Sequence, residues 1–93
     1  MFYVYTLFSK KDSQLYTGYT ENLQSRYHAH INGFVRSTKN RQPLILIGYE
    51  AFILESDARR REKYLKGGNG RNEVKKKFWD VLEKLKYKYL NSG

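Results

Sequence analysis

Two segments near the start of the chain, FYVYTLF at residues 2–8 and LYTGY at residues 15–19, decide the fold. Both are rich in aromatic and β-branched residues, which favour β-strands. The polar residues between them, Lys10 to Ser13, are typical of a turn. The sequence therefore predicts that the chain begins with a β-hairpin.

Because alternate side chains of a strand share a face, this hairpin divides its aromatic residues between two surfaces. Tyr3 and Tyr5 point to one side of the first strand, and Tyr16 and Gly18 share one side of the second. We expect Tyr5 and Tyr16 to be cross-strand neighbours on one surface. Gly18 then leaves a gap beside Tyr16 that a backbone or a ligand can enter. The alternative is ordinary packing in a chain that has nine tyrosines.

The length and composition indicate one domain with a modest core, which we expect to span residues 1–93. Without cysteine there is neither a disulfide framework nor a thiolate zinc site. The apolar runs fall short of the roughly 18 residues of a membrane span, and no signal peptide is visible. These features predict a cytoplasmic protein with no membrane partner.

The formal net charge is +9, and the excess is concentrated in residues 57–88, which hold 12 basic and 5 acidic residues. A surface of this kind attracts polyanions, and nucleic acid is the first candidate. The alternative is that these charges only keep the surface soluble.

Residues 23–32 have the pattern of a helix that follows a capping residue, Asn22, and ends at Gly33. Its apolar stripe consists of Leu23, Tyr27 and Ile31. His30 lies nearly in line with the stripe and Arg26 lies at its edge, so both flank the face that packs on the sheet. The structural alternative for His30 is a buried histidine with satisfied hydrogen bonds.

Residues 44–52 follow a polar, basic connection at residues 33–43 and have the pattern of a third strand. Both of its faces are apolar, one formed by Leu44, Leu46 and Gly48 and the other by Ile45, Ile47 and Tyr49. We therefore expect this strand to be covered on both sides.

Residues 57–66 predict a second helix, capped by Ser56 and ended by Gly67. Its apolar stripe consists of Leu54, Ala58 and Leu65. Glu62 falls within this stripe, where a carboxylate needs an arginine or a metal ion as its partner. The alternative is a glutamate at the helix edge whose carboxylate reaches water.

The glycine-rich residues 67–70 predict a flexible connection. They lack the lysine and hydroxyl of a Walker loop, which argues against a phosphate-binding loop. Asn72 is then expected to cap a basic C-terminal helix over about 72–90. Its apolar stripe consists of Val74, Phe78, Val81, Leu85 and Tyr89. The chain thus predicts an α/β (α+β) domain with the element order ββαβαα.

The order of these motifs resembles the GIY-YIG nuclease family, and in particular its short, single-domain bacterial branch, the YhbQ-like proteins. The resemblance covers residues 2–66 and begins with Tyr-Val-Tyr, ten residues and Tyr-Thr-Gly. The first helix adds Leu-x-x-Arg-x-x-x-His, and the next adds Ala-x-x-x-Glu and a lysine. The matching residues after the hairpin are Leu23, Arg26, His30, Thr38, Pro43, Ala58, Glu62 and Lys66.

The resemblance implies a three-stranded antiparallel sheet flanked by helices and an endonuclease that uses one divalent metal ion, Mg²⁺ or Mn²⁺. It assigns the metal-binding carboxylate to Glu62 and the other catalytic positions to Tyr5, Tyr16, Arg26 and His30. The implied substrate is duplex, branched or nicked DNA in structure-sensitive processing or repair. RNA and a protein partner stay open, and no small organic cofactor is expected.

The chemistry of these residue types agrees with such a reaction. A hard cation keeps several waters, so one carboxylate can suffice, and Arg26 can stabilise the charged phosphate through paired donors. Tyr5 or Tyr16 would orient or deprotonate the attacking water, and both stay candidates. Expected contacts to nucleic acid are Arg36, Lys39, Arg41, Arg59, Lys63, Lys66, Arg71 and Lys75. The alternative function is a non-catalytic nucleic-acid-binding module with the same fold and basic surface.

Overall fold

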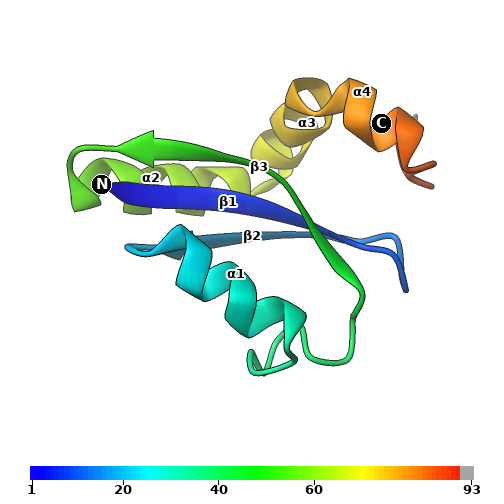
Figure 1. Cartoon of the computed structure of the whole chain (residues 1–93). Helices are drawn as coiled ribbons and strands as arrows, with labels where there is room; N and C mark the ends of the chain where they lie inside the picture. Colours follow the sequence, from blue (N-terminus) through cyan, green and yellow to red (C-terminus); the bar gives the residue numbers. More distant parts are fainter. Residues whose placement is uncertain (91–93) are drawn as a thin grey trace.

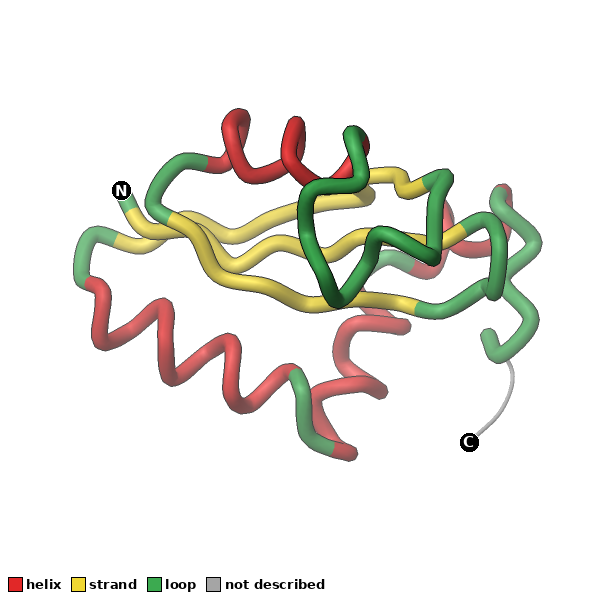
Figure 2. Tube along the Cα trace, turned by 90° about the horizontal axis from the view of Figure 1, so that it is seen from below, coloured by secondary structure: helices red, strands yellow, loops and turns green. Residues whose placement is uncertain are grey.

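The computed structural model describes residues 1–90, and its sheet has three antiparallel strands in the order β2-β1-β3. The strands are β1 (Phe2–Ser9), β2 (Leu15–Thr20) and β3 (Leu44–Phe52). The helices are α1 (Leu23–Ile31), α2 (Glu55–Leu65), α3 (Gly68–Lys77) and α4 (Trp79–Lys84). α1 covers one face of the sheet and α2 covers the other (Figures 1 and 2). The predicted α+β fold, an antiparallel sheet flanked by helices, is therefore confirmed. None of the helices in residues 1–90 is long and apolar enough to cross a membrane.

The central strand β1 separates two apolar clusters. Tyr5 and Leu7 are buried with Leu44 on the side of α1, whereas Val4 is buried with Ala58 of α2. The predicted alternation of β1 side chains is confirmed. Because burying each large apolar side chain contributes about 1.5–3 kcal/mol, both faces of β1 are fixed by packing.

Tyr5 and Tyr16 share a face of the sheet, but they are not direct cross-strand neighbours. Tyr5 lies opposite Gly18, and Leu7 lies opposite Tyr16, so the two tyrosines meet diagonally with ring centroids 6.3 Å apart. The space above Gly18 is filled by the Tyr5 ring, because a Cβ at Gly18 would collide with the Tyr5 hydroxyl. The predicted gap thus receives the protein's own tyrosine.

The pairing between β1 and β3 shifts by one residue at Ile47, which forms a β-bulge. Strict alternation places Gly48 on the α1 face with Leu44 and Leu46, and this prediction is wrong. The bulge turns Gly48 to the opposite face, where the ring of Phe78 lies directly over it.

α1 begins and ends close to the prediction, whereas α2 begins two residues early. The Asn22 side chain accepts a hydrogen bond from the backbone N–H of Ser25, and Gly33 follows α1 with a φ of +76°. Ser56 does not cap α2, because the helix already begins at the preceding residue and Leu54 is its N-cap residue; the acidic side chains of its first turn complement the helix dipole. Leu54 is 58% exposed and does not belong to the buried stripe.

The glycine-rich segment is helical, and the predicted helix over 72–90 is divided into two. α3 already begins at Gly68, and Gly70 packs so closely on α2 that a Cβ would collide with the Tyr64 carbonyl oxygen. α3 ends before Phe78, whose ring covers the sheet, and α4 follows at once. The break arises because Phe78 turns inward at this point.

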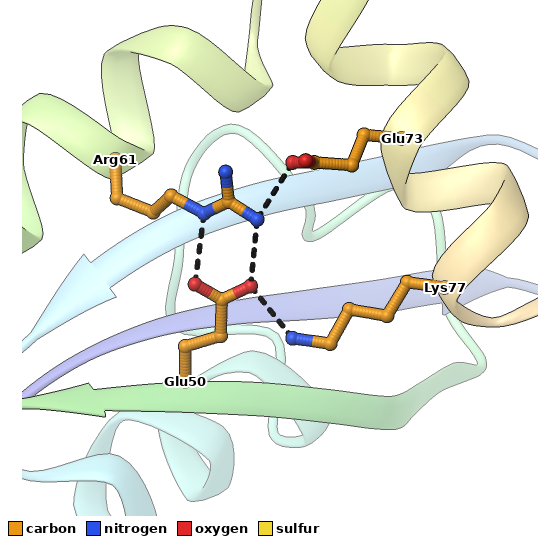
Figure 3. Close-up of polar contacts among 4 residues, drawn as sticks. All are labelled: Glu50, Arg61, Glu73 and Lys77. Atoms are coloured by element: carbon orange, nitrogen blue, oxygen red, sulfur yellow. Dashed lines mark hydrogen bonds and ion pairs between the residues drawn. The ribbon is translucent and has the colours of Figure 1, made fainter.

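An ion-pair network joins β3, α2 and α3 (Figure 3). Glu50 accepts two hydrogen bonds from the Arg61 guanidinium, at 2.8 and 3.1 Å, and one from Lys77 at 2.6 Å. Arg61 also pairs with Glu73 at 2.6 Å. Burial alone would raise the pKa of Glu50, but the bonds from Arg61 and Lys77 outweigh it and lower that pKa. The network therefore holds α2 and α3 on the sheet.

The Arg61→Met variant should lower the free energy of unfolding by about 2 kcal/mol, because the 22% exposed Glu50 and the 43% exposed Glu73 lose a shared partner. Urea unfolding at pH 7 measures this loss. The matched control is Arg60→Met, whose side chain is 74% exposed and pairs only along the helix with Asp57, so its cost should stay below about 0.5 kcal/mol. Equal losses in the two variants would contradict a structural role for the network.

Candidate active site

Three aromatic rings meet on the α1 face of the sheet. Tyr5 projects from β1, Tyr16 from β2, and His30 from the last turn of α1. The centroid of the His30 ring lies 5.6 Å from that of Tyr5 and 5.3 Å from that of Tyr16, both in edge-to-face arrangements. The alternation of the hairpin and the spacing of α1 thus bring three of the predicted catalytic residues together.

His30 is fully buried and has a hydrogen-bond partner at each ring nitrogen. Nε2 lies 2.8 Å from the Tyr5 hydroxyl, and Nδ1 lies 2.7 Å from Oγ1 of Thr38. Burial, together with the positive charge of Arg26, lowers the pKa of His30 to about 4. The imidazole is therefore neutral at pH 7, with one ring nitrogen donating and the other accepting.

Thr38 belongs to the site, although the sequence did not predict a functional role for it. It is fully buried in the connection between α1 and β3, and its hydroxyl lies within hydrogen-bond distance of Nδ1 of His30. Its only signal in the sequence is its place in the family motif, because a loop residue eight positions from His30 follows no helical or strand period. The neighbouring Ser37 hydroxyl lies 3.5 Å from that of Tyr16.

Arg26 reaches the same cluster from the middle of α1. It is half-buried, and its Nε lies 3.4 Å from the Tyr5 hydroxyl. The hydrogen bond to Tyr5 raises the pKa of Arg26 further. Burial raises the pKa of Tyr5, and the opposing contact with Arg26 does not cancel it, so Tyr5 carries its proton at neutral pH.

Glu62 lies on α2, which packs on the opposite face of β1 and β2. Its side chain is only 18% exposed, and its partner is Lys66, at 2.9 Å, rather than Arg26. Its negative charge nevertheless acts on the Tyr5 hydroxyl, among the causes that raise that pKa.

The donor set fits a cation site with a single protein carboxylate. Among residues 1–90, no group of three or more histidine, aspartate or glutamate side chains gathers in one place. Mg²⁺ retains several waters and accepts substrate oxygens, so one shielded carboxylate is a sufficient protein ligand. Glu62 already holds a cationic partner in Lys66, which shows that positive charge is accommodated beside it.

A groove of about 830 Å³ opens beside Tyr16 and gathers four of the eight predicted nucleic-acid contacts: Arg41, Lys66, Arg71 and Lys75. Arg36, Lys39 and Lys63 are exposed but lie outside its lining. Arg59 lies elsewhere, with its guanidinium 3.7 Å from the centre of the Tyr19 ring and paired with Glu55.

Acid should destabilise the protein through His30. A group whose pKa is depressed in the folded state stabilises the fold above its unfolded pKa, near 6.5, and loses that contribution as the pH falls toward 4. Between pH 7.5 and 4.5 the loss due to His30 should be roughly 2–3 kcal/mol. Urea unfolding of wild type and of His30→Gln at both pH values measures this loss of unfolding free energy. The control is His28→Gln, which replaces an exposed histidine. An identical pH dependence in wild type and His30→Gln would contradict a buried neutral imidazole.

Comparisons with known proteins find one matching family model and several relatives. The family model for the GIY-YIG catalytic domain matches residues 1–77. A UPF0213 protein of Clostridium perfringens is 45% identical over 67 residues, which is 71% of each chain. A UPF0213 protein of Staphylococcus haemolyticus is 39% identical over 74 residues, 78% of this chain and 89% of the relative. One of Natronomonas pharaonis is 42% identical over 65 residues, 69% and 75% of the two chains. No solved structure matches the chain.

Proposed function

Because the chain belongs to the GIY-YIG nuclease family, we propose that it is a metal-dependent endonuclease that hydrolyses phosphodiester bonds in DNA, with a role in DNA processing or repair. The observation that carries the proposal is the meeting of Arg26 and Tyr16 with the buried Tyr5–His30 pair on one sheet face. A basic groove begins at Tyr16, and the charge of Glu62 on α2 acts on the Tyr5 hydroxyl.

Arg26 is the residue that would bind the scissile phosphate. Its contact with the Tyr5 hydroxyl fixes the plane of the guanidinium, whose remaining donors match the oxygens of a phosphate. A fixed guanidinium stabilises the negative charge that grows on the phosphoryl oxygens in the transition state, without having to reorganise during the reaction.

The two tyrosines have different access to substrate. Tyr16 is half-buried and lines the groove, so its hydroxyl can contact the attacking water. Tyr5 is only 2% exposed and is held between Arg26 and His30. We therefore assign orientation or deprotonation of the water to Tyr16, and positioning of Arg26 to the buried chain of Tyr5, His30 and Thr38.

Glu62 would hold the divalent cation, Mg²⁺ or Mn²⁺. When bound, such an ion compensates charge on the phosphate and makes a coordinated water more acidic. The shielded carboxylate supplies the fixed negative charge, and the ion pair with Lys66 orients it.

The proposal is tested by incubating the protein with nicked, branched and single-stranded DNA in Mg²⁺ or Mn²⁺, with EDTA as the control. Cleavage should require the metal, whereas binding should persist in EDTA. Binding should also weaken at least tenfold between 50 and 200 mM salt, because phosphate contacts release counterions. A protein that binds these substrates but cleaves none of them would instead be the non-catalytic nucleic-acid-binding module.

A further inference from the structure

The groove beside Tyr16 contains a second set of aromatic residues that the catalytic site does not use. Its walls come from the start of β2, the connection between α1 and β3, the end of α2, α3 and the segment after α4, which contributes Tyr87 and Tyr89. The volume of about 830 Å³ falls in the range of roughly 300–1,000 Å³ that is usual for small-molecule sites. It is large enough for one nucleotide.

The aromatic wall is anchored on the core, and its outer ring is accessible to solvent. Tyr87 packs edge-to-face on the buried Phe8 with ring centroids 6.2 Å apart, and Tyr89 packs edge-to-face on Tyr87 at 5.7 Å. Tyr89 is 40% exposed although it lines a groove. A tyrosine that only completed the core would be buried, whereas a supported and accessible ring is a stacking platform for a base.

Positive charge lies next to this wall. Arg71 is near enough to Tyr87 that its charge opposes the rise in the pKa of Tyr87 that burial and Tyr89 cause. Lys66 lines the same groove. α3 begins here at Gly68 without a side-chain cap, so its first-turn N–H groups add to the attraction for an anion.

A base platform next to cations is the chemistry of a single-stranded nucleotide. A base inside a duplex is covered on both faces by its stacked neighbours and cannot lie on Tyr89. We propose that the groove binds one unpaired nucleotide of the DNA substrate, with the base on Tyr89 and its phosphates near Arg71 and Lys66. This rests on the proposed nuclease function, because Tyr16 lines the groove and also faces Arg26, so an adjacent phosphodiester would enter the catalytic site.

The test measures binding in EDTA, where cleavage cannot occur. Two duplexes of identical length and charge carry a one-nucleotide overhang, either with a base or with an abasic sugar. The wild type should bind the base-bearing overhang at least fivefold more tightly, since stacking of one base contributes about 1–3 kcal/mol. Tyr89→Leu should abolish this preference, and Tyr89→Phe should keep it because the ring remains. Tyr64→Leu, which removes a 47% exposed tyrosine outside the groove, should also keep it.

Equal binding of the two overhangs by the wild type, or a preference that survives in Tyr89→Leu, would overturn the proposal. Complete displacement of the overhang by a free nucleoside monophosphate at equimolar concentration would also overturn it, because the groove would then recognise the free nucleotide. A base preference in a protein that cleaves nothing would leave the subsite standing and refute the nuclease function. Metal-dependent cleavage without a base preference would support the nuclease function and refute the subsite.

Discussion

Replacing Glu62 by glutamine should reduce DNA cleavage in Mg²⁺ or Mn²⁺ by roughly a hundredfold or more. The substitution keeps the shape of the side chain but removes the charge that a cation needs, so charge compensation and water activation are lost together. The fold should hardly change. The bond to Lys66 joins residues four apart on one helix, and its partner is half exposed, so it contributes only about 0.3–0.5 kcal/mol. Cleavage rates and urea unfolding curves of both proteins measure the two effects.

The matched control for Glu62→Gln is Glu83→Gln, which changes an exposed glutamate on α4 and should leave cleavage within about twofold. DNA binding in EDTA should be unchanged or slightly stronger in Glu62→Gln, because one negative charge near the phosphates has gone. If Glu62 serves only as the helical partner of Lys66, both variants will cleave like the wild type, and the assignment of Glu62 to the cation will be wrong.

The Arg26→Met variant should lower the cleavage rate by about 10²–10³-fold, which is the usual cost of removing a donor to transition-state charge. Its melting temperature should fall by only a few degrees, since Arg26 is half-buried and methionine preserves much of its apolar packing. The comparison needs both numbers, a rate per folded molecule and a melting temperature. A large loss of stability with an unchanged rate would make Arg26 structural.

Two further arginine variants sharpen this test. Arg26→Lys keeps the charge but loses the planar fork of donors, so its rate should fall between those of wild type and Arg26→Met. Arg60→Met removes a 74% exposed arginine that pairs with Asp57 outside the site, and its rate should equal that of wild type. If Arg60→Met lost as much activity as Arg26→Met, the effect would reflect net charge rather than a specific phosphate contact.

The sequence predicts the fold well where a local rule dominates. Alternation assigns Val4 and Tyr5 to opposite faces, and capping chemistry places the start of α1 at Asn22 and its end before Gly33. The same periods bring Arg26 and His30 to the face that carries Tyr5. The alternation, the capping and the helical spacing each depend on residues within a few positions of one another, although the contacts of Arg26 and His30 with Tyr5 join distant parts of the chain.

Features that depend on distant contacts are not visible in the sequence. Nothing distinguishes Arg61 from its neighbouring arginines until α3 and β3 approach it with Glu73 and Glu50. Thr38 belongs to the site because the loop that carries it contacts His30. A loop has no regular periodicity from which the sequence could predict this contact. The bulge at Ile47 is likewise a property of the pairing between two strands rather than of either strand alone.

Alternate side chains of β1 serve the core and the catalytic site. Insertions of one residue and of two residues in this strand therefore have different consequences. Val4 and Thr6 are buried on the α2 side, while Tyr5 between them supports Arg26 on the other. Inserting a single residue within β1 would shift the register beyond the insertion by one and exchange these roles, unless a bulge absorbed the extra residue as at Ile47, whereas inserting two would restore them. Length changes of two residues within the paired strands should therefore preserve both the catalytic face and the core, whereas a change of one residue should need a compensating bulge.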